Sequence, residues 1–504
     1  MSAAPPADEE PGRDRPAAEG ERSRSEALGA LAVSGSNIIR FSVQLALLPI
    51  LARLIGPEEY GLVALAIPFI LFCNIFSDGG LGVALARQQN PSREMESTVF
   101  WIAGGLGLAL ALVFCVLAWP ISRLLNHPQL PPLIIALSPI MVMSGLTAAA
   151  NARIIRNGLF AVFAGSDLIS VVGSSLVAVM AAAHGWGAWS IVAQQLTLWS
   201  LKLAWVQFGS KLRVRFVCRP REVVDLLRFG GNTVGAGLAD FATRNLDKLI
   251  IGGVLGALPL GYYAMAYQII RVPDYVVSGP FYLFVFSRIA RGTDPEAFPQ
   301  VVQIAVASIR SAVIALGAIF GGLAIVAHSA IPVILGPEWS GAISSLEWLS
   351  LAGFGFSMSY VFGAILMAAG RVEQQLRVSI AGSVLTVIAV TATAHLGLWP
   401  VACAVATATL AMVAIYLRLI AAYLRMRVSA LLAVFVAPAL GVAGMGVAVR
   451  TVSAATTHLH GLVQLALLVC VGAVAYIAVL AAVTRRRLQN DLRLLLTDTP
   501  GASI

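Results

Sequence analysis

Long apolar runs follow one another along almost the whole chain. Each holds about 20 residues, the length that an α-helix needs to cross the hydrocarbon core of a bilayer. The runs do not alternate polar and apolar positions as the strands of a membrane barrel would. We therefore expect an all-α integral membrane protein with about 14 transmembrane helices. The predicted spans are 28–51, 60–83, 97–118, 131–151, 159–183, 187–208, 229–253, 261–287, 301–328, 341–369, 373–394, 399–417, 430–449 and 461–483.

Part of the first half of the chain is repeated 200 residues later. The segment GPEEYGLVALA (56–66) corresponds to GALPLGYYAMA (256–266), and nine positions between 35 and 79 are identical to their counterparts at this offset. The offset contains six predicted spans, and an even number of spans returns the chain to the same side of the membrane. The repeat therefore predicts two pseudo-symmetric six-helix lobes of parallel orientation, followed by two additional C-terminal helices.

The spans also set the expected domain boundaries. Residues 1–27 mix proline, alanine and both charge signs without the apolar stretch of a secretory signal, so a disordered cytoplasmic tail is expected there. The remaining parts are an N-lobe at 28–208, a basic cytoplasmic linker at 209–228, a C-lobe at 229–425, spans 13 and 14 at 426–484, and a cytoplasmic tail at 485–504.

Composition and charge agree with a multi-pass protein whose two termini are cytoplasmic. Of the 504 residues, 58% are hydrophobic and 12% are charged, whereas soluble domains carry roughly 25% charged residues. With a cytoplasmic N-terminus, 25 of the 34 lysines and arginines fall in cytoplasmic segments, and only Arg53, Arg123 and Arg450 fall on the opposite side. The net charge of +9 thus indicates anionic membrane lipids as partners and not nucleic acid.

Several kinds of site are not expected from this sequence. The five cysteines form no CxxC motif and the histidines are scattered, so neither a metal nor a cofactor is expected. The predicted outer loops are short and no GxxxxGK[ST] motif is present, which argues against a polymerase, a glycosyltransferase or an ATPase. The GGLG stretches at 79–82 and 104–107 are expected to be helix-packing sites or flexible points, and not nucleotide loops. Tryptophans near outer span ends are expected to form an interfacial belt: Trp119, Trp186, Trp189, Trp339 and Trp399.

Ionisable residues inside the predicted spans are the candidates for function. Each costs roughly 2.5–3.5 kcal/mol at the membrane centre, so such a residue faces a cavity or a partner. Span 7 contains Asp240, Arg244, Asp247 and Lys248. This set is either a neutralised ladder packed against another helix, or the polar wall of a water-filled cavity. In the second case Arg244 or Lys248 could leave its acid and bind a phosphate.

Two further charges lie deep in the first lobe. Arg40 in span 1 has no acid nearby in the sequence, which favours a cavity position unless Asp78 or Asp167 pairs with it across helices. Asp167 in span 5 is a candidate for proton or cation coupling, because an isolated carboxylate in low dielectric holds its proton more tightly. A satisfied helix contact is the alternative for Asp167, and Lys202 is expected to be structural.

Two predicted spans carry helix-interrupting residues at corresponding points. Span 8 contains Arg271-Val-Pro273-Asp274 before Gly279, and span 2 contains Asp78-Gly79-Gly80 near the matching offset. Proline removes a backbone donor and bends a helix. Interrupted helices at matching positions of two halves are a sequence indicator of a transport site.

Five segments resemble one known family of transporters. They are LARLIGPEEYGLVALA (51–66), FSDGGLGVALARQ (76–88), RNLDKLIIGGVLGALPLGYYAMAYQI (244–269), SRIAR (287–291) and ILGPEW (334–339). From about 28 to 425 the chain resembles the polysaccharide transporter family. Its members are lipopolysaccharide and exopolysaccharide flippases of the multidrug/oligosaccharidyl-lipid/polysaccharide exporter superfamily.

The resemblance implies two lobes around a central cavity that opens alternately to either side of the bacterial inner membrane. The implied substrate is undecaprenyl-diphosphate carrying an oligosaccharide repeat unit, with a polysaccharide polymerase and glycosyltransferases as protein partners. The implied diphosphate-binding residues are Arg40, Arg244, Lys248 and Arg271. The family also uses a base on helix 2, where this chain has an acid. The candidates for ion coupling are Asp78, Asp167 and Asp240.

Alternatives of three kinds remain open from the sequence. Within the superfamily, the chain could move lipid II, or it could export drugs, although drug exporters have twelve spans and cavities biased toward acids. From a different class, a membrane polymerase or glycosyltransferase is the alternative. A non-transporting scaffold is the third, and it would have little reason to keep bases at mid-membrane.

Overall fold

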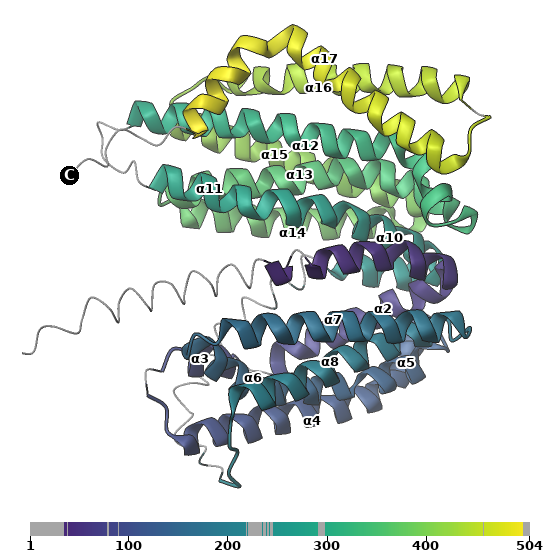
Figure 1. Ribbon diagram of the computed structural model, residues 1–504, viewed down its shortest axis with the longest axis vertical. Coiled ribbons are helices and arrows are strands. Elements are labelled where there is room, and N and C mark those ends of the chain that lie inside the picture. The colour runs from purple at the N-terminus through teal and green to yellow at the C-terminus, as the bar shows by residue number, and fades with distance from the viewer. Residues whose placement is uncertain are drawn as a thin grey trace, which may run out of the picture. The chain divides into compact units, whose positions relative to one another are not determined.

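The computed structural model describes residues 35–37, 39–77, 80–88, 90–217, 219, 234, 238, 241, 245–290, 298–456 and 458–496. Every regular element in these residues is a helix, as Figure 1 shows. Twelve helical segments among them are long and apolar enough to cross a membrane. The all-α, multi-pass architecture predicted from the apolar runs is therefore confirmed.

Two of the fourteen predicted spans do not belong to these twelve segments. The span predicted at 187–208 corresponds to α8 (Ala188–Ser210), a helix of 23 residues that is not among the twelve. The span predicted at 229–253 lies largely outside the described residues, although 245–255 are helical. A count of fourteen spans therefore stays a prediction.

The described chain forms two compact units. The first contains residues from Met1–Leu48, Ile70–Ala118 and Pro132–Gly237, and the second contains residues from Pro49–Phe69, Trp119–Pro131 and Leu238–Ile504. Two stretches of the first half of the sequence thus pack with the second half. They are the start of α2 (Pro57–Ser77) with the residues before it, and the end of α4 (Arg93–Leu125) with the turn that follows.

Closely packed helices make up the first unit. Its elements include α3 (Leu81–Ala86), most of α4, most of α5 (Leu130–Leu137), α6 (Pro139–Arg156), α7 (Phe160–Ala183) and α8. Glycines bring α4 and α6 together, because a Cβ on Gly107 would lie 2.9 Å from the carbonyl carbon of Met141, and one on Gly145 would lie 2.7 Å from that of Ala103. The expected packing role of the GGLG stretch is confirmed at Gly107.

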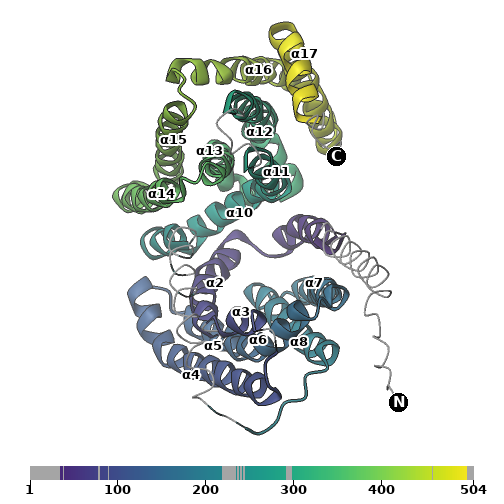
Figure 2. The same cartoon turned by 90° about the vertical axis from the view of Figure 1, so that its left-hand side faces the viewer.

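The second unit contains the remaining long helices. They are α10 (Ala257–Pro273), η2 (Asp274–Ser278), α11 (Gly279–Ala290), α12 (Phe298–Ile334), η4 (Pro337–Ala342), α13 (Ile343–Ala368), α14 (Val372–Thr393), η5 (Ala394–Leu396), α15 (Leu398–Tyr423), α16 (Val428–Ala455) and α17 (Gly461–Leu496). The last two helices, which have no counterpart in the first half, pack on each other and on α12 (Figures 1 and 2). The hydroxyl of Tyr476 on α17 donates to the carbonyl of Ile314 on α12 over 2.7 Å.

The two repeated segments contact each other within the second unit. A Cβ on Gly61 of α2 would lie 2.7 Å from the carbonyl carbon of Ala257, and one on Gly261 of α10 would lie 2.8 Å from that of Pro57. Gly61 and Gly261 are 200 residues apart, and so are Pro57 and Ala257, so exchanging the two segments maps the contact onto itself, as in a twofold interface. The sequence repeat is therefore also a structural pseudo-symmetry, and glycine is required at both positions.

Both predicted interruptions are present. In the second half, α10 and α11 are joined by the π-helical turn η2, which begins directly after Pro273. In the first half, α2 ends at Ser77 and α3 begins at Leu81, after Gly80 with a φ of 70°. Local breaks in the α-helical pattern of this kind are common at functional sites.

Candidate functional site

The residues predicted to bind or couple fall into three groups. Asp78, Asp240 and Arg244 lie outside the described residues. Arg40 and Asp167 belong to the first unit, and Lys248 and Arg271 belong to the second.

Arg40 is half-buried in the first span (Gly35–Leu54). Its guanidinium carbon lies 5.4 Å from the centroid of the neighbouring Phe41 ring, a distance at which a cation is attracted to an aromatic face. Its Nε is buried and has no hydrogen-bond partner among the residues with described positions. A buried guanidinium N–H without an acceptor is costly, and an anion could satisfy it.

Asp167 is not the isolated carboxylate that the sequence suggested. Its Oδ1 lies 2.9 Å from Nζ of Lys202, and the two side chains are 15% and 22% exposed. Asp167 is on α7 and Lys202 is on α8, and these two helices pack along each other in the first unit (Figure 1). Lys202, which was expected to be structural, is the charge partner of Asp167. The two residues are 35 positions apart on different helices, so spacing along one helix could not predict their pairing.

A polar cluster surrounds Lys248 in the second unit. Its ammonium lies 5.0 Å from the centroid of the Tyr267 ring. The adjacent Asp247 is 7% exposed and accepts two hydrogen bonds, one from the backbone N–H of Lys248 and one from the hydroxyl of Tyr263, each over 2.8 Å. Tyr263 is fully buried, and its ring stacks on that of Tyr267 with centroids 6.0 Å apart.

The cluster continues along α10 to the helix interruption. Tyr263, Tyr267 and Arg271 follow one another at intervals of four residues and therefore share one face of α10. Asp274 opens η2 one turn after Arg271, and its Oδ1 accepts a hydrogen bond of 3.0 Å from Ser357 of α13. We call the set of Asp247, Lys248, Tyr263, Tyr267 and Arg271 the Lys248 cluster.

Two of the four charged residues of the predicted span 7, Asp247 and Lys248, lie within the described residues. The Asp247 carboxylate accepts from a hydroxyl and a backbone amide, and the Lys248 ammonium lies against an aromatic ring. Arg271 follows Tyr267 by one turn on the same face of α10, and an ammonium and a guanidinium can both bind phosphate oxygens.

A second cluster, which the sequence did not indicate, centres on Trp339 of η4. We call the set of Ala52, Arg53, Tyr60, Tyr262 and Trp339 the Trp339 junction. Trp339 was expected in the interfacial belt but is fully buried, and its indole Nε1 donates to the carbonyl of Ala52 over 2.8 Å. The rings of Tyr60 and Tyr262 pack edge-on at centroid distances of 5.7 Å and 6.3 Å. The other belt tryptophans are at least 44% exposed, as expected.

Arg53 extends this Trp339 junction. Its Nε donates to the carbonyl of Ile334 over 3.0 Å, and its Nη2 donates to that of Val333, both at the end of α12. The carbonyl of Glu338, the residue before Trp339, accepts a hydrogen bond of 3.2 Å from the Tyr262 hydroxyl. Residues 52–60 of the first half are thus held against η4 and α12 of the second half within one compact unit. The signal in the sequence was the motif pair LARLIGPEEYG and ILGPEW, but not the contact between them.

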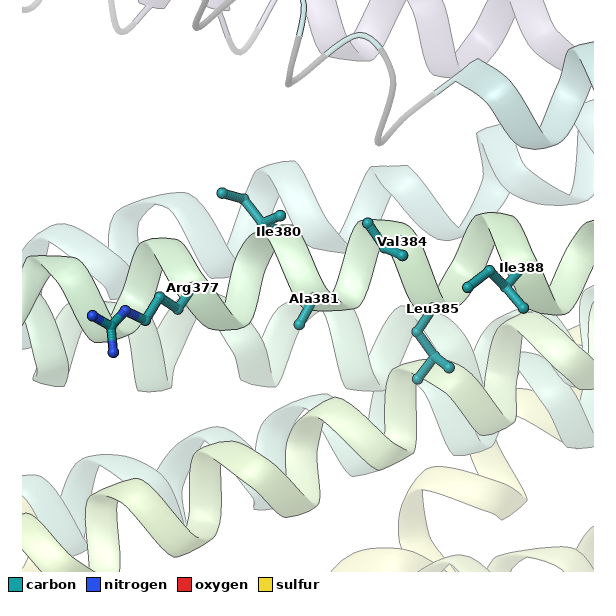
Figure 3. Close-up of a pocket in the computed structure, with 6 residues that line it drawn as sticks. All are labelled: Arg377, Ile380, Ala381, Val384, Leu385 and Ile388. Carbon is teal, nitrogen blue, oxygen red and sulfur yellow. The ribbon is translucent and has the colours of Figure 1, made fainter.

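A groove of about 500 Å³ runs along one face of α14. Figure 3 shows its lining, which is apolar except for Arg377 at one end; the apolar residues are Ile380, Ala381, Val384, Leu385 and Ile388. Arg377 is paired with Glu373 over 2.6 Å, and both side chains are at least 75% exposed. None of Arg40, Lys248 and Arg271 lines this groove.

Comparison with known proteins identifies the family. The model of the family described as "Polysaccharide biosynthesis protein" matches residues 50–344, which is more than half of the chain. The succinoglycan biosynthesis transport protein ExoT of Rhizobium meliloti (strain 1021) is 28% identical over 62% of this chain, and the chain spans 63% of the length of that protein. The lipopolysaccharide biosynthesis protein WzxC of Escherichia coli (strain K12) is 25% identical over 67% of this chain and 69% of its own.

A solved structure has the same fold. The lipid II flippase MurJ in an inward closed conformation superimposes with a TM-score of 0.71, covering 91% of this chain and 99% of its own at 13% sequence identity. Such a low identity supports the fold and not the substrate. The family match confirms the resemblance given by the glycine–tyrosine segments: the chain belongs to the polysaccharide biosynthesis protein family.

Proposed function

We propose that this protein is a flippase of the bacterial inner membrane with both termini in the cytoplasm. Its substrate is an undecaprenyl-diphosphate-linked oligosaccharide repeat unit used for surface polysaccharide. The sugar head group crosses through a hydrated basic cavity while the isoprenoid tail stays in lipid. The observation that carries this proposal is the Lys248 cluster, a cationic and aromatic site next to a helix interruption in a repeat-built membrane fold.

The cationic residues have a common role in this proposal. Arg40, Arg244, Lys248 and Arg271 bind the diphosphate. Arg40 and Lys248 each lie against an aromatic ring, which holds the cation in place without neutralising its charge. Asp78 and Asp240 remain the proposed coupling acids. Asp167 can serve in coupling only if its pairing with Lys202 is broken during the cycle.

The Trp339 junction supports alternating access. It joins residues 52–60 of the first half to η4 and α12 through hydrogen bonds to main-chain carbonyls. In the proposed topology these residues lie on the outer side of the membrane. If opening of the cavity to that side separates residues 52–60 from η4, the junction must break in each transport cycle.

The experiment compares Lys248→Ala with Arg377→Ala. Arg377 is a matched control because it is also a base in an apolar helix, but it is exposed and paired with Glu373 outside the cluster. Purified variants in vesicles are given fluorescent undecaprenyl-diphosphate oligosaccharide, and the fraction that becomes accessible to the opposite side is measured over time. The Lys248 variant should lose most of this transport, and the Arg377 variant should keep it.

Further arms of the same assay separate the alternatives. Equal transport of lipid II, or transport of a cationic drug in place of the oligosaccharide lipid, would assign the chain to another branch of the superfamily. Release of polymerised product would indicate an enzyme. Normal transport by Lys248→Ala at normal protein levels would contradict the assignment of the cluster as the diphosphate site.

A further inference from the structure

We propose that Asp247 and Tyr263 are positioning residues, which fix Lys248 and Tyr267 in the geometry that binds the diphosphate. The proposal rests on the flippase function and names two residues that touch no substrate. The sequence indicated Asp247 only as one member of the charged set of span 7, and it did not indicate Tyr263.

The four residues form a closed circuit between two helices. Asp247 and Lys248 are neighbours in the helical segment 245–255, and Tyr263 and Tyr267 are one turn apart on α10. The carboxylate accepts the Tyr263 hydroxyl, the Tyr263 ring stacks on Tyr267, and the Tyr267 ring contacts the Lys248 ammonium. The backbone N–H of Lys248 then returns to the carboxylate. Each member therefore restricts the next.

Burial explains why the circuit is rigid. Tyr263 is fully buried and Asp247 is 7% exposed, so neither polar group can exchange its partner for bulk water. An unpaired carboxylate in such a place is strongly unfavourable, which keeps the hydrogen bond between them intact. By contrast, Tyr267 and Lys248 are only half-buried and remain within reach of a ligand. The buried pair thus lies behind the pair that meets the substrate.

A flexible lysine benefits from this support. Its side chain has four rotatable bonds, and each rotamer lost on binding weakens affinity. Contact with a fixed aromatic ring confines the ammonium beforehand without cancelling its charge. Tyr263 would consequently affect anion binding although its hydroxyl is turned toward Asp247 and not toward the ligand.

The test is a double-mutant cycle with Tyr263→Phe and Lys248→Met. The phenylalanine keeps the buried ring and removes only the hydroxyl. Binding of inorganic pyrophosphate to the purified full-length protein is measured by calorimetry. Tyr263→Phe should weaken binding by about fivefold to tenfold, the loss that one hydrogen bond gives. In the Lys248→Met background the same change should have no further effect, because it acts through Lys248.

Tyr476→Phe is the matched control. It also removes one hydroxyl that donates within the second unit, to the carbonyl of Ile314, far along the chain from Lys248. It should leave pyrophosphate binding unchanged. Equal weakening by Tyr476→Phe, or equal weakening by Tyr263→Phe with and without Lys248, would reduce Tyr263 to a structural residue and overturn the proposal.

A second readout does not depend on the flippase function. The rate at which an acylating reagent modifies Lys248 is followed by mass spectrometry. Tyr263→Phe and Asp247→Asn should each change this rate by roughly threefold or more, since a cation–π contact is lost or displaced. An unchanged rate refutes the positioning role. A changed rate together with pyrophosphate binding that is insensitive to Lys248→Met would uphold the positioning and reject the diphosphate site.

Discussion

Replacement of Gly61 by alanine tests whether the two repeated segments meet as described. The new methyl carbon would lie 2.7 Å from the carbonyl carbon of Ala257 and 2.9 Å from the backbone nitrogen of Gly261, with the Ala257 oxygen closer still. These neighbours are main-chain atoms and cannot rotate away as a side chain would. Because ordinary contacts begin near 3.4 Å, the backbones of α2 and α10 must separate by roughly 1 Å or more.

The expected cost follows from this forced separation. Overpacking a close contact costs about 1–3 kcal/mol, and the immobile backbone places Gly61→Ala in the upper part of that range. Alanine regains up to about 1 kcal/mol through its better helix propensity. The net destabilisation should be about 2 kcal/mol. Gly261→Ala should be destabilising to a similar extent. The double variant should cost less than the sum of the two single variants, because one separation of α2 from α10 relieves both contacts.

The assay is thermal unfolding of the purified protein in detergent. Gly105→Ala of α4 is the control, since its added methyl group would meet no atom within 4 Å. This control should unfold at the same temperature as the parent or slightly higher. A Gly61→Ala variant as stable as the Gly105→Ala variant, or strictly additive effects of the two repeat glycines, would show that the helices do not cross at these residues.

Three further substitutions test other parts of the structure. Glu96→Gln should destabilise the first unit by about 3 kcal/mol, because the Glu96 side chain is 4% exposed and pairs with both Arg153 (3.0 Å) and Arg156 (2.6 Å). As its control, Glu373→Gln removes a charge from an exposed ion pair with Arg377 and should change the melting temperature little. Trp339→Phe should cost about 1–3 kcal/mol in the same assay, since the Ala52 carbonyl loses its donor. Asp167→Asn should destabilise the protein more than the double variant Asp167→Asn with Lys202→Met, because the double variant leaves no buried charge unpaired. The reverse order of stability would disprove the ion pair.

The candidate site shows how far sequence reasoning reached. Lys248 and Arg271 were selected because charges at membrane depth are costly, and the structure places both in the second unit, with Lys248 against Tyr267 and Arg271 one turn further along the same helix. The helix interruption after Pro273 was predicted from the same segment and is present as η2. Arg244, Asp78 and Asp240 lie outside the described residues, so their roles stay predictions.

The partners of these residues were not predictable. For Asp167 the sequence left ion coupling and a helix contact open, and the structure shows a contact with Lys202 of the next helix. Trp339 was assigned to the membrane interface from its position near a span end, yet it is buried against residues 52–60. Spacing along one helix carries no information about which faces of two helices meet, so neither partner could be predicted.

The sequence by itself determined the elements of this protein: helical spans, their interruptions and the repeat of 200 residues. These properties are local, because the thickness of the bilayer sets the length of an apolar run and a proline or glycine acts where it stands. Only the tertiary structure decided that Gly61 and Gly261 face each other, that Asp247 binds Tyr263, and that Lys248 lies on Tyr267. Such contacts depend on helix faces that pack at long range, and a similar apolar pattern is compatible with many ways of packing them.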